Sequence, residues 1–362
     1  MPNSHRSQTR MSKFLYDAAA LLRDGKELIE QRLGRAVPLL TRSEIIGAYR
    51  AILDREPADD AEIEASRKEH PSLSQLRWRM LASDAYRSCN PPMHVTPLSG
   101  DEPPMQIEEV DDNEQLQALV SHVQEAWQHL GETEPYWSVI AGDEYRMANI
   151  ERTRDQFYRT GQSDVERVRR TLERNGIQMS TLRTCLEYGC GVGRVTRWLT
   201  SHFAQVYAYD ISLPHLRSLE RDLRGMGKTH VVFKQTHSVE DLSRLPKVDF
   251  VYSLLVLQHN PPPVIALIIE QLLRALHPGG YAYFQVPTYR LDYSFQLADY
   301  LENEGKRPEM ETHVLPQRKI FELILRNGAQ LVEVLEDGHM GVRYRERSNT
   351  FLIRKLAAEE RR

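Results

Sequence analysis

The stretch Cys185–Leu199 reads CLEYGCGVGRVTRWL and decides how the second half of the chain folds. It begins with the apolar residues of a strand and ends in a helical pattern that starts at about Val195. Gly189, Gly191 and Gly193 lie between the two. Glycines let the backbone turn sharply and approach a ligand closely. The N-terminus of the helix that follows offers free N–H groups to that ligand. The sequence therefore predicts a strand, a ligand-binding turn and a helix, in that order.

Short β-rich runs alternate with helical stretches from this point onward, which favours a parallel sheet covered on both faces. The expected strands are Cys185–Tyr188, Gln205–Tyr209, His230–Lys234, Asp249–Leu257 and Tyr281–Val286, with helices at Val195–Ser201, Pro214–Leu223 and Pro262–Leu276. A further helix and two strand-like runs, Gln330–Leu335 and Asn349–Arg354, follow Gln317. Because only a short stretch separates these runs, they are expected to pair as an antiparallel hairpin. The predicted fold class is α/β, with a doubly wound, mostly parallel seven-stranded sheet.

Composition indicates a soluble globular protein with more than one domain, because the chain has 362 residues, 41% of them hydrophobic. The formal net charge of -4 gives no basic field that would attract nucleic acid. Cys89, Cys185 and Cys190 lack metal-ligand spacing and cannot form a disulfide framework, which is typical of the reducing cytoplasm. No segment approaches the roughly 18 apolar residues that span a bilayer. We expect a cytoplasmic protein, with peripheral membrane contact and the oligomeric state left open.

Changes of composition predict the domain organisation. The expected parts are a disordered tail (1–12), a helical module (13–90), a linker rich in proline and acidic residues (91–112), a helical extension that acts as a lid (113–180) and the sheet domain (181–357), with a substrate-side insert at 288–316.

The helical module carries a Tyr-x-x-(Ile/Leu)-Leu-x-Arg-Glu-Pro pattern at Tyr49–Pro57 and a Ser-x-x-(Tyr/Phe)-Arg pattern at Ser83–Arg87. This combination resembles a small bacterial helical domain of unknown function, which is often joined to enzymes of surface-glycan assembly. The alternative is a generic helical bundle without a catalytic role.

The spacing of the glycines indicates which ligand the turn holds. A dinucleotide-binding loop has its third glycine three residues after the second, where this chain has Arg194. The E-x-G-x-G-x-G form, with Glu187 before Gly189, resembles the first motif of the class I methyltransferases. The resemblance implies a Rossmann-like methyltransferase fold, S-adenosyl-L-methionine as cofactor, and a loop of Gly189, Cys190 and Gly191 around its methionine half. It also places Glu187 near the amino group, where a carboxylate is attractive; near a pyrophosphate it would be repulsive.

Asp210 ends the expected second strand, where a carboxylate can accept hydrogen bonds from both hydroxyls of a ribose. Enzymes that bind NAD also place an acidic residue at this position. An NAD-dependent enzyme is therefore an alternative, and only the spacing of the glycines argues against it. The other cofactor-binding residues that the resemblance implies are Ile211 beside Asp210, Ser238 or Val239 against the adenine, and Leu254 beneath the cofactor.

His259 is the candidate catalytic base, because the resemblance puts Gln258 and His259 at the start of the substrate side. A hydroxyl is a poor nucleophile unless its proton is removed as it attacks, and a histidine with a pKa near 6.5 suits that task. The alternative is that His259 only caps or packs the loop. No acidic residue lies at the ends of the fourth and fifth strands, LLVLQHN and FQVPTY, so we expect no metal.

Two segments are expected to shape the acceptor pocket. Tyr136, Trp137 and Tyr158 precede the first strand, where the family commonly adds a lid, and core packing is the alternative for each. The insert after the fifth strand lies over the carboxyl edge of the sheet and contributes Tyr289, Arg290 and His313. His313 is also a second candidate base.

The Asn260-Pro261-Pro262-Pro263 stretch resembles the Asn-Pro-Pro-Tyr motif of enzymes that methylate amino nitrogens. Here Pro263 replaces the aromatic residue, and a proline-rich helix N-terminus is the alternative. We therefore expect methyl transfer to an oxygen of a small or glycan-related acceptor, in bacterial surface-polysaccharide or secondary metabolism. N- or C-methylation of a small molecule, lipid or protein, and a non-catalytic module that binds cofactor or glycan, are the alternatives.

Overall fold

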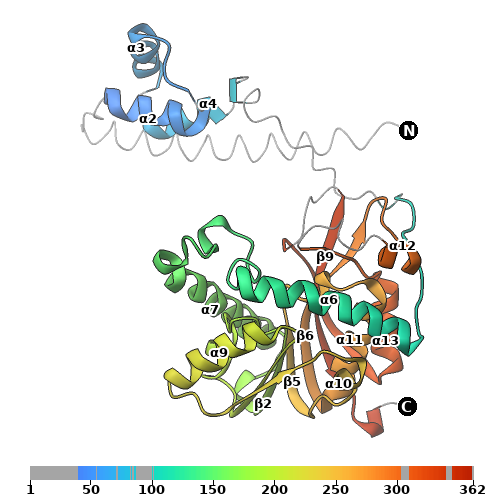
Figure 1. Cartoon of the computed structure of the whole chain (residues 1–362). Helices are drawn as coiled ribbons and strands as arrows, with labels where there is room; N and C mark the ends of the chain where they lie inside the picture. The colour runs from blue at the N-terminus through green and yellow to red at the C-terminus, as the bar shows by residue number, and fades with distance from the viewer. Residues whose placement is uncertain are drawn as a thin grey trace. The chain divides into compact units, whose positions relative to one another are not determined.

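The chain forms two compact units, Met1–His94 and Val95–Arg362 (Figure 1). The computed structural model describes residues 40–53, 55–70, 72–81, 83, 85–86, 100, 102–302, 310–339 and 345–360. The expected tail at 1–12 and the first part of the helical module, up to residue 39, lie outside the described residues, as does residue 89. In the described part of the chain, no helix combines the length and the apolarity that crossing a membrane requires.

The described residues of the first unit form the short helices α2 (Arg42–Leu53), α3 (Asp60–Glu69) and α4 (Leu73–Leu81). Thr41 and Glu44 form a capping box at the start of α2, with Thr41 N donating to Glu44 Oε2 over 2.8 Å. The residues of the Tyr49–Pro57 pattern act in packing, because the Arg55 guanidinium lies over the Tyr49 ring and pairs with Glu62 on α3.

The second unit is built on a seven-stranded sheet with the order β4-β3-β2-β5-β6-β9-β8. Its strands are β2 (Thr184–Tyr188), β3 (Gln205–Asp210), β4 (Val231–Gln235), β5 (Val248–Ser253), β6 (Leu276–Arg290), β8 (Ala329–Asp337) and β9 (Glu346–Lys355). The first five are parallel, and β9 is antiparallel to both β6 and β8. The predicted fold class and hairpin are confirmed.

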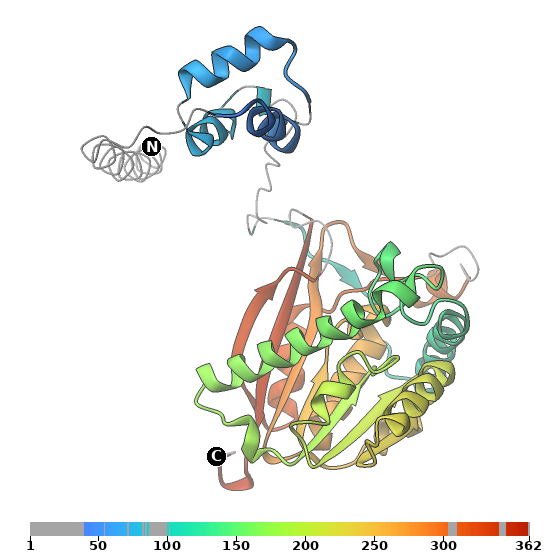
Figure 2. The same cartoon turned by 90° about the vertical axis from the view of Figure 1, so that its left-hand side faces the viewer.

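Helices cover both faces of this sheet. They are α6 (Asn113–Thr133), α7 (Ile150–Arg174), α8 (Thr196–Leu199), α9 (Leu213–Gly225), α10 (Val239–Ser243), α11 (Pro262–Ala275), α12 (Leu297–Glu302) and α13 (Gln317–Arg326), with 3-10 turns η1 (Asp143–Tyr145), η2 (Met179–Thr181), η3 (Leu257–His259) and η4 (Ala358–Glu360). Figures 1 and 2 show helices on both sides of the sheet. The buried side chains of α6, α10, α11 and α13 pack on one face, and those of α7, α8 and α9 pack on the other. Successive residues of the strands point alternately to these two faces, as expected for a sheet buried on both sides.

One strand ends earlier than its sequence pattern predicts. The apolar run continues to Leu257, but β5 stops at Ser253 because Leu255 has a left-handed backbone with φ 62°. The chain then turns into η3, so residues 254–260 form the rim of the sheet.

Part of the predicted linker belongs to the sheet domain. Residues 106–107 form β1 (Gln106–Ile107), which pairs in parallel with β7 (Ser294–Phe295) in the insert. Glu108 accepts a hydrogen bond from Leu297 N over 2.7 Å, and Tyr289 donates to Pro103 O over 2.8 Å. A two-residue strand carries no detectable periodicity, so composition alone suggested a linker up to residue 112.

Helix α7 contacts the glycine loop directly at Gly161. A Cβ atom at this position would lie 1.9 Å from the carbonyl oxygen of Arg194. Three residues later on the same helix, Asp164 forms a buried ion pair with Arg194 at 2.5 Å. The close approach and the ion pair together fix α7 against the loop.

Replacing Gly161 with alanine should destabilise the sheet domain by about 2 kcal/mol or more, because the added methyl group overlaps main-chain atoms that have little room to shift. Gly225→Ala is the matched control, since nothing lies within 4 Å of a Cβ atom there. Chemical unfolding of both variants checks this, and equal stability of the two would contradict the contact.

Candidate active site

The loop after β2 needs glycine for two reasons. Gly189, Gly191 and Gly193 have φ values of 78°, 52° and 81°, which side chains strongly disfavour. Space is also missing, because a Cβ atom at Gly189 would lie 2.3 Å from the Val256 side chain, and one at Gly191 would lie 2.6 Å from Val139. The loop is therefore enclosed between the rim after β5 and the segment after α6.

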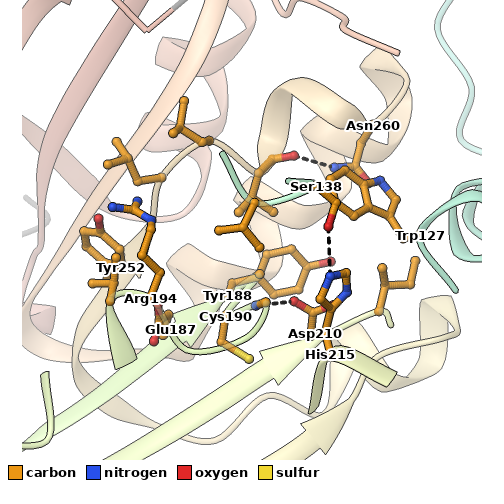
Figure 3. A pocket seen from close by; sticks show the side chains of 18 of the residues that line it. Trp127, Ser138, Glu187, Tyr188, Cys190, Arg194, Asp210, His215, Tyr252 and Asn260 are labelled. Atoms are coloured by element: carbon orange, nitrogen blue, oxygen red, sulfur yellow. Dashed lines mark hydrogen bonds between the residues drawn. The ribbon is translucent and has the colours of Figure 1, made fainter. Parts of the chain in front are cut away.

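Asp210, at the tip of β3, holds this loop in place. Its Oδ2 accepts a hydrogen bond from Gly191 N over 2.7 Å (Figure 3). Its Oδ1 accepts one from Ser212 N over 2.8 Å. The residue is only 6% exposed. A carboxylate has about four acceptor positions, so each oxygen can accept a further hydrogen bond from a ligand hydroxyl.

Glu187 lies on β2 beneath the loop and is 3% exposed. Its Oε2 has no hydrogen-bond partner among the described residues, and neither have Arg194 Nε and the Tyr252 hydroxyl. Burial raises the pKa of Glu187 to about 8, so the free protein holds this carboxyl largely protonated at neutral pH. Unpartnered buried polar atoms cost free energy, which a ligand with an ammonium and a carboxylate group could recover. These residues fit the methionine end of S-adenosylmethionine.

A pocket connects these groups (Figure 3). The expected cofactor residues that line it are Glu187, Gly189, Cys190, Gly191, Asp210, Ile211 and Leu254. Ser238 and Val239 are not part of its lining. Ser238 caps α10 by accepting from Asp241 N over 3.0 Å, and Val239 N donates to Gln117 Oε1 of α6 over 3.0 Å. Helix α6 thus covers the turn where the adenine was expected.

The expected acceptor aromatics lie outside this pocket. Tyr136 and Tyr158 belong to a buried cluster with Phe157, and Trp137 packs its ring against the Arg146 guanidinium at 4.0 Å. The Tyr158 hydroxyl donates to Asp222 Oδ2 over 3.2 Å. Tyr136 and Tyr158 thus pack between α7 and the loop, which is the core-packing alternative, whereas Trp137 is half-buried.

The expected insert residues also lie outside the pocket. Arg290 binds Thr312 through two hydrogen bonds of 2.7 Å. His313 lies between the Tyr293 hydroxyl, 2.8 Å from Nδ1, and the Glu311 carboxylate, 3.0 Å from Nε2. Both residues border a separate surface hollow, whereas the Tyr289 hydroxyl is bound to Pro103 O.

Several lining residues were missed at the sequence level. They are Val123, Trp127, Ser138, Val139, Tyr188, Arg194, Val195, His215, Tyr252, Leu255 and Val256. Ser138 Oγ lies 3.0 Å from His215 Nε2, which ties the segment after α6 to the start of α9. Trp127 comes from the apolar face of α6, and helical periodicity marks such positions only as buried.

Gln285 on β6 organises the rim after β5. This fully buried side chain accepts a hydrogen bond from Leu255 N over 3.1 Å. Its Nε2 donates to Gln258 Oε1 over 3.1 Å and to Ser348 Oγ over 2.7 Å. The left-handed Leu255 is thus held by one amide that also contacts η3 and β9.

His259 adjoins the pocket without lining it. Its Nδ1 lies 2.8 Å from the Glu311 carbonyl oxygen, which can only accept, so Nδ1 carries the proton. Its Nε2 then accepts from Gln258 Nε2 over 3.2 Å. Burial lowers the pKa of His259 to about 4, which keeps the ring neutral at pH 7. The ring packs edge-on against Trp127 at 5.1 Å, and Trp127 does line the pocket.

No group of three or more His, Cys, Asp or Glu side chains within the described ranges is arranged to hold a metal ion.

A family model described as "Methyltransferase domain" matches residues 154–334, half of the chain. No curated protein matches. Similar solved structures include magnesium protoporphyrin IX methyltransferase (ChlM) from Synechocystis PCC 6803 with bound SAH, with 20% identity, a TM-score of 0.44, and coverage of 64% of this chain and 98% of that chain. An S-adenosylmethionine-dependent methyltransferase from Clostridium acetobutylicum ATCC 824 has 14% identity and a TM-score of 0.38, covering 52% of this chain and 89% of that chain.

Similarities at these identities and scores say nothing about the acceptor, whereas the family match includes β2, the glycine loop and Asp210. The chain belongs to the methyltransferase-domain family and is an S-adenosylmethionine-dependent methyltransferase.

Proposed function

We propose that this protein transfers a methyl group to an oxygen atom of a small or glycan-related acceptor. The acceptor oxygen forms a bond to the methyl carbon while the carbon–sulfur bond breaks, and the acceptor hydroxyl loses its proton. The observation that carries the proposal is one pocket. It joins the Glu187 carboxyl, whose Oε2 has no hydrogen-bond partner among the described residues, to a rim with a neutral histidine beside it.

The cofactor would lie between the tips of β2, β3 and β5. Glu187 would bind its ammonium group, the loop from Gly189 to Gly191 would enclose the methionine part, and Asp210 would accept the ribose hydroxyls. The sulfonium supplies an activated methyl group and a good leaving group. The protein therefore has to orient the acceptor and exclude water.

The choice of oxygen rests on His259. A neutral imidazole can take a hydroxyl proton once the Gln258 amide, 3.2 Å away, gives up its hydrogen bond to Nε2. The glycan context rests on the resemblance of the helical module, which lies outside the matched residues 154–334. Mass spectrometry of a product labelled from the cofactor would distinguish oxygen from nitrogen or carbon. Absence of turnover to S-adenosylhomocysteine with any cell extract would favour a binding module.

Asp210→Ala should weaken S-adenosylmethionine binding by about 1–3 kcal/mol, because the ribose loses charged acceptors and the loop loses its tie to β3. Asp249→Ala is the matched control: Asp249 also binds main-chain N–H groups, at 3.0 Å and 2.9 Å, but at the start of β5 and outside the pocket. Calorimetric titration of both variants checks this, and equal affinities would reject the placement of the ribose.

Cofactor affinity should rise with pH between about pH 5.5 and 7, where an α-amino group stays charged. Glu187 is largely protonated in the free protein because its pKa is raised to about 8, and binding a cation requires it to release that proton. Affinity should therefore increase by up to about tenfold per pH unit. Glu187→Gln, which cannot ionise, should remove this dependence in calorimetry. A wild-type affinity that does not change with pH would contradict the contact.

With S-adenosylmethionine kept saturating, turnover should stay constant as the pH falls from about 8 to 5 if His259 is the base, because its pKa of about 4 keeps it neutral over that range. A base with an ordinary histidine pKa would lose activity below about pH 6.5. His259→Asn should lower turnover roughly 100-fold with unchanged cofactor affinity. A variant that keeps its turnover would leave His259 with a packing role.

A further inference from the structure

Asn260 ends the rim after β5, and its side chain has a defined orientation. Its Nδ2 donates to Val256 O over 3.1 Å and to Leu257 O over 3.4 Å. Both partners are carbonyl oxygens that can only accept, so the amide nitrogen must face them and the amide oxygen must face away. The turn η3 therefore determines how the Asn260 carboxamide is presented.

The Asn260 side chain lines the pocket and is only 7% exposed. Its Oδ1 accepts no hydrogen bond from the described residues. Although the side chain is largely buried, Oδ1 itself is accessible from the pocket, so this acceptor atom is available to a donor on a ligand. Figure 3 shows Asn260 and Glu187 on opposite sides of the pocket. A donor on a second molecule can therefore reach Asn260 while Glu187 binds the cofactor.

The wall beside Asn260 carries no positive charge that would recognise a phosphate. Its side chains are those of Val123 and Trp127 on α6, and Leu255 and Val256 on the rim. Arg194 is the only Lys or Arg among the described residues of the pocket lining, and it is bound to Asp164. The lining near Asn260 is thus largely apolar and aromatic. Of its polar groups, the Ser138 hydroxyl is engaged with His215 Nε2 at 3.0 Å, whereas the Asn260 amide oxygen is not bound by the described residues.

We propose that Asn260 is the specificity-determining residue for the acceptor, and that the acceptor presents an uncharged ring carrying a hydroxyl group. The hydroxyl donates to Asn260 Oδ1, and the ring packs on the apolar wall that includes Trp127. This inference rests on the proposed function, because it assigns the acceptor side of the same pocket. Phenolic rings and neutral sugar rings share this chemistry.

The test uses the full chain saturated with S-adenosylhomocysteine, so that no methyl transfer occurs during calorimetry. The probes are 2-naphthol and 2-methoxynaphthalene, which differ by the one donor that Asn260 is proposed to bind. The wild type should bind 2-naphthol about tenfold more tightly. Asn260→Ala should bind the two probes equally. Asn260→Asp, which keeps an acceptor oxygen but loses the amide donor to η3, should retain the preference.

The ratio of the two probe affinities separates recognition by Asn260 from damage to the turn, because a misplaced rim would weaken the binding of both probes alike. A second arm compares methyl β-glucopyranoside with glucose 1-phosphate. Tighter binding of the methyl glucoside than of 2-naphthol would identify a neutral sugar as the source of the hydroxyl, and the reverse would identify a phenol.

Two results would overturn the proposal while leaving the function intact: a probe preference unchanged in Asn260→Ala, or glucose 1-phosphate binding more tightly than both neutral ligands. Failure of all the probes to bind cofactor-saturated protein would also overturn it. A chain that does not bind S-adenosylhomocysteine at all would instead refute the proposed function, and that titration comes first.

Discussion

The architecture of this site depends on the hydrogen bond between Gly191 N and the Asp210 carboxylate. It joins the loop after one parallel strand to the tip of the next, at the edge of the sheet where ligands bind in folds of this type. The loop can follow this path only because its glycines adopt left-handed conformations, and α7 can lie against it only because Gly161 has no side chain. The β2 and β3 tips, the loop and α7 therefore form one rigid support for the pocket.

The two sides of the pocket differ in their chemistry. Beneath the loop, Glu187, Arg194 and Tyr252 leave buried polar atoms without partners among the described residues, which suits a ligand that carries its own charges. Across the pocket, Trp127 and Asn260 belong to a lining that is largely apolar, and no described residue donates to the Asn260 amide oxygen. Under the proposed assignment, the cofactor would be held mainly by electrostatic contacts and the acceptor mainly by shape.

Sequence reasoning recovered the features that are encoded locally. The glycine spacing, Asp210 and the alternation of strands and helices each lie within a short stretch, and the structure agrees with the fold that they predict. Trp127 was missed because α6 joins the site only through tertiary packing. Tyr158 was expected in the acceptor pocket because an aromatic residue has the same signature in a core and in a pocket. The early end of β5 could not be anticipated either, since the side chain that holds Leu255 comes from a distant residue.

Gln285, which holds Leu255, also connects the rim to Ser348 on β9. Because β9 lies beside β6, the Gln285 side chain that supports the rim acquires its hydrogen bond to Ser348 only when β9 is in place. During synthesis on the ribosome, the loop and both cofactor carboxylates emerge long before Ser348 does. A nascent chain can thus form the cofactor side before Ser348 has been synthesised, whereas the acceptor side is completed only afterwards.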